Sequence, residues 1–400
     1  MRKNLWMLGM AVAALTSCTQ SEVLDIAESK TINFDSFVGK QTRATNDVGQ
    51  TENFDVFYVY AAKGEKISNS FVADNDGETF FNGEKVHRTK ITTGTSSSWS
   101  NWTYATPKPW TVDKTYRFAA YANGHGATDD PAKLSSGVEF NAKMQNVMPL
   151  SGTTPLAETW GLKFSSYEAG TTDLIVSVPN EEKRSTTAEL VNTMNLTFDH
   201  ALAKVIFRFV LDQNAGENLE VTIDPFSLNA IKTSDCSVYN NPNLTSTTNK
   251  TEINWASQNI KATDATSIEA ASESNIAIGD YVVVPEGGEL VLKKDDENTD
   301  IVEDDQSIAF YVIPQSNDIT VTFKGTSKDA NGNTVGTTTF GNVSLKITDH
   351  DKWLPGYVYR YTASLNPQIN YIHFAASVTA WTDEPNRDQG IVGSATGQNN

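Results

Sequence analysis

The stretch "MNLTFDHALAKVIFRFVL" (residues 194–211) decides the fold class. In its second half Ala203, Val205, Phe207 and Phe209 alternate with Lys204, Ile206, Arg208 and Val210, so one face is wholly apolar and the other is mixed. Successive side chains of a β-strand point to opposite faces, so this period of two predicts a strand with one buried face. The stretch therefore indicates a β protein with an apolar interior.

Similar short strands recur on both sides of this stretch, between clusters of Gly, Asn, Asp, Ser and Thr. No long segment after residue 50 has the 3.6-residue period of a helix. Two upstream strands are expected to present apolar faces made of Phe54, Val56, Tyr58 and Tyr60, and of Tyr116, Phe118, Ala120 and Ala122. The sequence thus predicts an all-β fold, with enough strands in each half for a two-sheet sandwich.

The chain of 400 residues is too long for one ordinary domain. We expect one domain over residues 44–193 and a second over residues 194–381, with the boundary following "EEKRSTTAELVN". Residues 382–400 have few apolar side chains and are predicted to form a flexible tail.

Charge and cysteine content narrow the classes of function. The net charge is −18, from 49 acidic and 31 basic residues, which disfavours nucleic acid as a partner. Cys18 and Cys236 are the two cysteines, so a disulfide framework is excluded and Cys236 is expected to be a single buried thiol.

The N-terminus has the features of an export signal. Arg2 and Lys3 precede the apolar run "LWMLGMAVAAL", which is too short to span a bilayer. The run closes in "LTSC", which resembles the bacterial lipobox and predicts a signal peptide over residues 1–17 and lipidation at Cys18. An ordinary export signal with a chance cysteine is the alternative. No aspartate follows Cys18, which fits transfer to the outer membrane.

No catalytic motif emerges from the sequence. The histidines are scattered without metal-binding spacing, and neither a phosphate-binding loop nor a G-x-S-x-G turn is present. We therefore predict a protein that is not an enzyme and that uses no metal and no cofactor.

An aromatic cluster, "SSSWSNWTYATPKPW" (residues 96–110), allows two interpretations. Exposed indole rings are good platforms for sugars, so Trp99, Trp102 and Tyr104 are candidate glycan contacts. In the alternative, Trp110 is part of the core and the other two tryptophans cover an edge of the sandwich.

Four segments resemble the fimbrillin family, which comprises pilins and accessory subunits of type V pili. They are "PWTVDKTYRFAAYAN" (residues 109–123), "FDHALAKVIFRF" (198–209), "YVIPQ" (311–315), and "WLPGYVYRYTASL" (353–365) followed by "SVTAW". The resemblance implies two tandem transthyretin-like, Greek-key β-sandwich domains and assembly into adhesive surface fibres. Its implied partners are other pilus subunits, bound by strand addition. A stalk, tip or anchor role is not implied.

The segment "KTINFDSFVGKQTRA" (residues 30–44) combines a strand with a cleavable loop. Ile32, Phe34 and Val38 alternate with polar residues, and the polar loop after them suits an Arg-specific protease that cuts between Arg43 and Ala44. Lys40 is an alternative processing point. By resemblance to the family, the cut releases residues 18–43 as a lipidated leader strand.

Removal of a strand leaves apolar side chains and unpaired backbone groups that accept a strand from another chain. The candidate donor is "YIHFAASVTAW", in which Ile372, Phe374, Ala376, Val378 and Ala380 share one face. The alternative is that this segment is the last strand of its own domain.

The leading hypothesis is therefore an adhesive fimbrial subunit at the outer membrane and cell surface. The competing hypothesis is a monomeric surface lipoprotein that binds host or bacterial glycans through the aromatic cluster. The two differ in the fate of residues 18–43.

Overall fold

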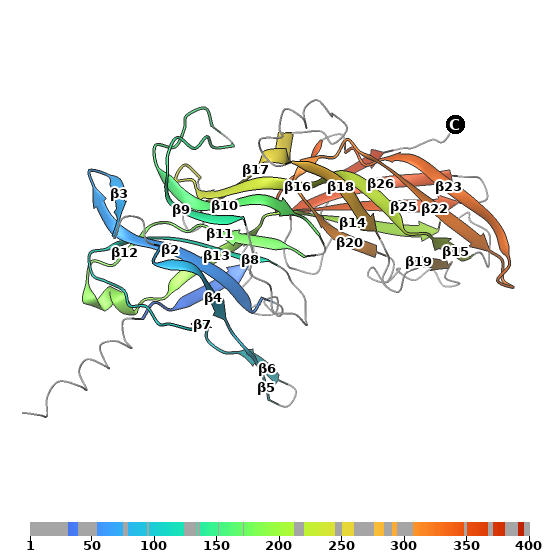
Figure 1. The fold of residues 1–400 in the computed structure, drawn as a ribbon. Helices are drawn as coiled ribbons and strands as arrows, with labels where there is room; N and C mark the ends of the chain where they lie inside the picture. Colours follow the sequence, from blue (N-terminus) through green and yellow to red (C-terminus); the bar gives the residue numbers. More distant parts are fainter. Residues whose placement is uncertain are drawn as a thin grey trace, which may run out of the picture.

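The structure of the protein is a computed structural model, which describes residues 31–38, 54–74, 79–93, 96–123, 134, 137–150, 152–170, 172–211, 220–244, 250–259, 276–283, 290–293, 307–347, 350–366, 371–380 and 391–395. Within these ranges nearly all regular structure is β, and the helices are two short 3-10 turns, η1 (Thr187–Val191) and η2 (Ala256–Asn259). The all-β prediction is confirmed (Figure 1). Within this part of the chain, no helix has the length and apolar character needed to cross a membrane.

The first half of the chain builds a nine-stranded sheet with the order β1-β13-β11-β8-β2-β4-β7, in which β12 also pairs with β8 and β3 with β2. We call it the first sheet. Its strands are β1 (Phe34–Val38), β2 (Val56–Ile67), β3 (Ser70–Ala73), β4 (Phe81–His87), β7 (Thr103–Tyr104), β8 (Thr115–Asn123), β11 (Leu174–Ser177), β12 (Glu182–Lys183) and β13 (Met194–His200). A separate hairpin of β5 (Lys90–Thr93) and β6 (Ser96–Trp99) extends from it (Figure 1).

Strands β2 and β8 are central because both of their faces are apolar. Every residue of β8 from Thr115 to Ala122 is buried. One face of the first sheet packs in what we call the first core, which contains Tyr116, Phe118, Ala120 and Ala122 as predicted. The other face joins the second core, which extends into the C-terminal half.

The expected face of β2 is correct except at its beginning. Val56, Tyr58 and Tyr60 lie together in the second core. Phe54 lies in the first core instead, because it precedes β2 and is outside the regular alternation of the strand.

A second sheet contains strands from both halves of the chain. Its centre is β16 (Phe226–Asn240), which pairs with β10 (Thr159–Glu168), β17 (Thr251–Trp255) and β18 (Ala277–Val283), and β10 pairs in turn with β9 (Val138–Met144). Figure 1 shows β16 running beside β10 and β18. The expected boundary at residue 193 does not separate the sheets, because β13 follows it and pairs with β1 and β11.

The remaining strands form two sheets that enclose the C-terminal part of the second core. One has the order β20 (Ser307–Val312), β14 (Ala203–Leu211), β25 (Tyr357–Asn366), β26 (Tyr371–Ala380), β27 (Ile391–Ala395). The other has the order β19 (Leu290–Lys293), β15 (Glu220–Ile223), β22 (Thr320–Lys328), β23 (Thr334–Ser344). A two-stranded pair joins β21 (Gln315–Ser316) to β24 (Lys352–Trp353).

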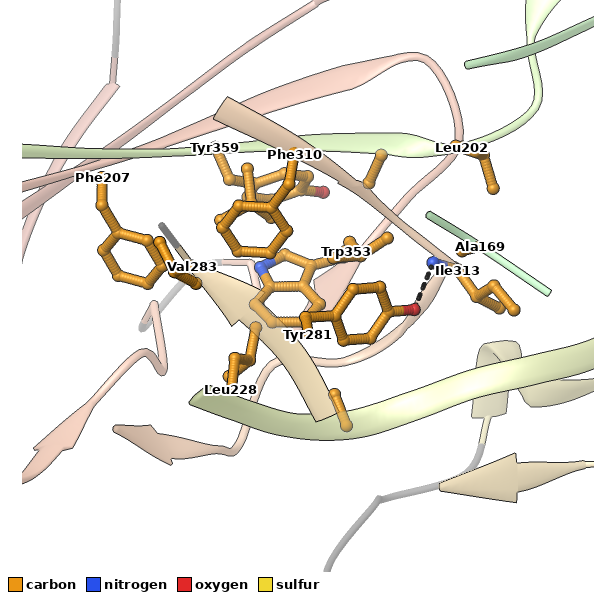
Figure 2. Packing of buried hydrophobic residues seen from close by; sticks show 14 of the residues in the cluster. Ala169, Leu202, Phe207, Leu228, Tyr281, Val283, Phe310, Ile313, Trp353 and Tyr359 are labelled. Carbon is orange, nitrogen blue, oxygen red and sulfur yellow. Dashed lines mark hydrogen bonds between the residues drawn. The ribbon is translucent and has the colours of Figure 1, made fainter. Parts of the chain in front are cut away.

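Burial along β14 follows the alternation that the sequence predicted. Ala203, Val205, Phe207 and Phe209 are all buried in the second core. Figure 2 shows Trp353 within this core, near Tyr281 and Phe310. Its indole Nε1 donates a hydrogen bond of 2.9 Å to the hydroxyl of Tyr361, so its polar atom is satisfied inside the core.

The tail differs from the expectation of a flexible segment. Ile391–Ala395 form β27, which pairs antiparallel with β26 from Val378↔Ile391 to Phe374↔Ala395. The β-branched residues Ile391 and Val392 suit a strand, and β26 offers an open edge for pairing. Residues 381–390 and 396–400 lie outside the described residues.

Candidate functional site

The predicted leader strand is built into the first sheet. β1 pairs in parallel with β13, from Phe34↔Met194 to Val38↔Phe198. Just before it, the Met194 N–H donates a 2.7 Å hydrogen bond to the carbonyl of Asn33. β1 is the terminal strand of the sheet, so β13 alone flanks it within the ladder.

The inward side chains of this segment are part of the first core. Ile32 has 0% of its surface exposed and Phe34 has 5%. The Phe34 ring lies edge-on to the rings of Phe57, Phe81, Tyr104 and Phe118, at centroid distances of 5.9, 5.8, 5.7 and 6.2 Å. Such edge-to-face pairs stabilise beyond simple area burial. We call these contacts, together with the backbone of β13, the β1 site.

The two ends of the first sheet meet at the β1 site. Tyr104 belongs to β7, the strand at the far end of the sheet from β1. Its hydroxyl donates a 2.8 Å hydrogen bond to the carbonyl of Ile32. The sheet therefore curls around the first core, and the segment of Ile32 and β1 closes the seam between β13 and β7.

The candidate glycan contacts pack mostly against the protein itself. Arg88 lies between two indole rings, 4.4 Å from the Trp99 centroid and 4.5 Å from that of Trp102. Trp102 is 9% exposed and packs on Phe54. This geometry supports the alternative in which the tryptophans cover an edge of the sandwich, and it leaves Trp102 without an open face for a sugar.

Trp110 lies in the first core, as that alternative expects. It is 3% exposed, and its ring centroid is 4.8 Å from that of Tyr116. The Arg184 guanidinium lies over the Trp110 ring, 4.7 Å from its centroid. Tyr104, the third candidate glycan contact, uses its hydroxyl to bind Ile32.

The candidate donor residues are in β26, within its own sheet. β26 pairs antiparallel with β25 over its whole length and with β27 on its other side. Ala376 and Val378 are buried at 3% and 7% exposure, whereas Ala380 is exposed. The side chains of Ile372 and Phe374 lie outside the described part of the structure. Donation of this strand to another chain stays a prediction.

Cys18, Arg43 and Ala44 lie outside the described residues, so lipidation and cleavage also stay predictions. Cys236 is a free, buried cysteine, as expected. Burial raises the pKa of its thiol well above the ordinary value, which keeps it protonated and unreactive. Among the described residues, no group of three or more His, Cys, Asp or Glu side chains could hold a metal ion.

A buried charge cluster is one feature that sequence reasoning missed. The Arg117 side chain is 3% exposed and forms ion pairs of 2.8 Å with Glu158 and 2.5 Å with Glu181. It also donates to the carbonyl of Ala142 in β9 and lies between the rings of Phe71 and Trp160. The signal in the sequence was an arginine inside the apolar strand "TYRFAAYA", since buried charges are rare unless paired.

The cluster fixes the charge state of Glu158. Burial acts to raise the pKa of this carboxyl, but hydrogen bonds from the Phe71 N–H, the Ser70 hydroxyl and Arg117 outweigh it and lower the pKa to about 2. The ionised cluster ties β3, β8 and β9 together. It therefore links the first sheet to β9 and to the residue that precedes β10.

Comparison with known proteins identifies the family. No curated protein matches the sequence. A fimbrial protein from Bacteroides vulgatus aligns at 14% identity, over 88% of this chain and 100% of that one, with a TM-score of 0.45. A fimbrial assembly protein from Parabacteroides distasonis aligns at 12% identity, over 88% of this chain and 98% of that one, with a TM-score of 0.32.

The fimbrial anchor protein Mfa2 from Porphyromonas gingivalis aligns at 10% identity, over 88% of this chain and 98% of its own, with a TM-score of 0.25. The decisive match is to a family model described as fimbrillin-like, which covers residues 42–381. It spans most of the chain, from β2 to β26, and leaves out β1. The chain belongs to the fimbrillin-like family.

Proposed function

We propose that this protein is a structural and adhesive subunit of a cell-surface fimbrium that assembles by strand exchange at the β1 site. It is exported as an outer-membrane lipoprotein through Cys18 and matured by cleavage between Arg43 and Ala44. The observation that carries the proposal is the position of β1. It contributes buried side chains to the first core, yet it ends at Val38, shortly before the predicted cleavage point.

Cleavage converts β1 from a covalent part of the fold into a bound peptide. After the cut, Ile32 and Phe34 are held only by packing and by hydrogen bonds to neighbouring segments. Departure of the peptide exposes the aromatic rings that surround Phe34 and the edge of β13. An apolar surface beside an open strand edge is a template for strand addition.

The sequence of β26 supports it as the incoming strand. Residues 32–38 read "INFDSFV" and residues 372–378 read "IHFAASV". At the four alternating positions both segments have isoleucine, phenylalanine, a small residue and valine. The proposed register is the one in which Ile372, Phe374, Ala376 and Val378 replace Ile32, Phe34, Ser36 and Val38.

Donation of β26 requires the C-terminal sheet to open. β26 and β27 must separate from β25, which pairs with β26 from Tyr357↔Ala380 to Asn366↔Tyr371. Breaking this ladder is costly, so exchange is slow. In the fibre, withdrawing the donated strand would uncover the apolar β1 site again, so the assembled fibre is kinetically stable. The leader strand acts earlier: while it occupies the β1 site, no other strand can bind there. It therefore delays assembly until the protein has reached the cell surface.

The test begins with purified protein treated with an Arg-specific protease. The cut protein is expected to form oligomers that survive heating in sodium dodecyl sulfate, whereas the Arg43→Ala variant stays uncut and monomeric. Lys40→Ala is the matched control and should assemble normally. Complete cleavage after Arg43 with only monomers present would contradict strand exchange.

A competing peptide tests the register without disturbing the fold. A synthetic peptide of residues 371–380 should block assembly of the cut protein, and the same peptide with Phe374→Ala should block it far less. Equal inhibition by both peptides would contradict the assigned register.

A further inference from the structure

We propose that Tyr104–Trp110, which we call the strap, is a second wall of the β1 site that binds the backbone of whichever strand lies there. Tyr104 is the central residue of this contact, and its ligand is an extended peptide segment. The identity of an incoming strand rests on the function proposed above. The contact between the strap and the leader segment does not.

The strap satisfies both backbone groups of Ile32. The Ile32 N–H donates a 2.8 Å hydrogen bond to the Lys108 carbonyl, and the Ile32 carbonyl accepts a 2.8 Å hydrogen bond from the Tyr104 hydroxyl. One residue earlier, Thr31 forms an antiparallel bridge with Pro109. One residue later, the Asn33 carbonyl accepts from Met194 of β13 on the other side. The segment therefore enters the sheet between two walls.

The Tyr104 hydroxyl is held in the orientation that this contact requires. It accepts a 3.1 Å hydrogen bond from the Lys108 N–H, which directs its own proton toward the Ile32 carbonyl. Burial raises the pKa of Tyr104, so the hydroxyl stays a donor at neutral pH. Its ring packs on Phe34 and on Phe81, with centroids 5.7 and 5.5 Å away. Tyr104 thus contacts the backbone at Ile32 and the side chain two residues later.

The strap is itself fixed to the rest of the first sheet. Tyr104 pairs with Val86 of β4, and the Lys108 ammonium donates to the Phe80 carbonyl while lying 4.9 Å from the Phe81 ring. Trp110 ends the strap inside the first core. These contacts make the strap a preformed surface.

This arrangement defines what the β1 site accepts. The occupant needs an N–H and a carbonyl at the position of Ile32, which excludes proline there, and an aromatic side chain two residues further on. At Ile32 the strap contacts backbone atoms and at Phe34 it contacts the ring, so outward-facing positions are free to vary. The segment at Ile372 and Phe374 meets both requirements.

Hydrogen exchange of the intact, uncut protein tests the strap without requiring cleavage or assembly. Tyr104→Phe keeps the ring and removes the hydroxyl, so it should leave the fold in place. Loss of one hydrogen bond should speed amide exchange about fivefold to tenfold in peptides that cover residues 31–36. Tyr167→Phe is the matched control, because it also removes a hydroxyl hydrogen bond, 3.1 Å to Asn123, but in the second core.

The expected result is faster exchange at residues 31–36 in Tyr104→Phe alone. Unchanged exchange there, or an equal increase in β22 and β23, would overturn the proposal. If exchange changes as expected but the cut protein never assembles, the strap is retained and strand exchange is rejected. If the cut protein assembles but exchange at residues 31–36 is unchanged, the strap is rejected and strand exchange is retained.

Discussion

The Phe34→Ala substitution tests how strongly the leader segment is held by its aromatic surroundings. Phe34 is 5% exposed and contacts the rings of Phe57, Phe81, Tyr104 and Phe118. Removing such a ring from a packed core typically costs about 3–5 kcal/mol, because the surrounding rings cannot fully collapse into the space. We expect the uncut variant to lose about 3 kcal/mol of its free energy of unfolding.

The same substitution has a larger practical effect once the chain is cut. A loss of about 3 kcal/mol corresponds to an affinity for the leader peptide that is lower by roughly a hundredfold. The cut variant should therefore release its leader sooner and assemble faster than the cut wild-type protein. In the uncut protein the substitution should only reduce stability.

Urea denaturation of the uncut proteins and fluorescence of a labelled leader in the cut proteins measure these two effects. Asn33→Ala is the matched control, since Asn33 is exposed and its carbonyl, not its side chain, bonds to Met194. It should change stability by less than about 0.5 kcal/mol. A cost below about 1 kcal/mol for Phe34→Ala would refute the assignment of β1 as a core strand.

Buried groups elsewhere in the protein give three more predictions. The pKa of Glu158 is lowered to about 2 from 4.5, so its stabilising effect is present above pH 4.5 and is lost as the pH falls toward 2. In an acid titration, the Glu158→Gln variant should therefore lose less stability over that pH range than the wild-type protein does. The Cys236 thiol should react with a thiol reagent only after unfolding, and rapid labelling at Cys236 in the folded protein would contradict its burial. Trp353→Phe removes ring volume and the hydrogen bond to Tyr361, so it should lower the free energy of unfolding by about 2–4 kcal/mol. Urea denaturation measures this loss, and a value below about 1 kcal/mol would argue against the packing in Figure 2.

Local pattern was enough to predict the strands, because alternation is a property of neighbouring residues. The strand at Ala203 and the apolar face of β8 both follow directly from it. The same alternation in residues 32–38 identified the segment that fills the β1 site. Family-like segments added the order of these elements and an expectation of strand exchange.

Pairing partners were beyond the reach of the sequence because they depend on contacts between distant segments. The polar segment before residue 193 favoured a boundary there. β13 nevertheless joins the first sheet and β16 pairs with β10, so strands from both sides of residue 193 share sheets. Arg117 could be noticed as unusual, but its partners Glu158 and Glu181 are contributed by other parts of the chain. Its aromatic neighbours in sequence made Tyr104 a candidate glycan contact, whereas its contact with Ile32 joins opposite ends of the first sheet and has no local signal.

The most direct test of strand exchange is intact mass analysis of the protein recovered from its native cell surface, combined with gel analysis of its oligomers. The proposal predicts a chain that begins at Ala44, has lost β1, and migrates as heat-resistant oligomers. A chain that still carries an acylated Cys18 and stays monomeric after Arg-specific cleavage would contradict it.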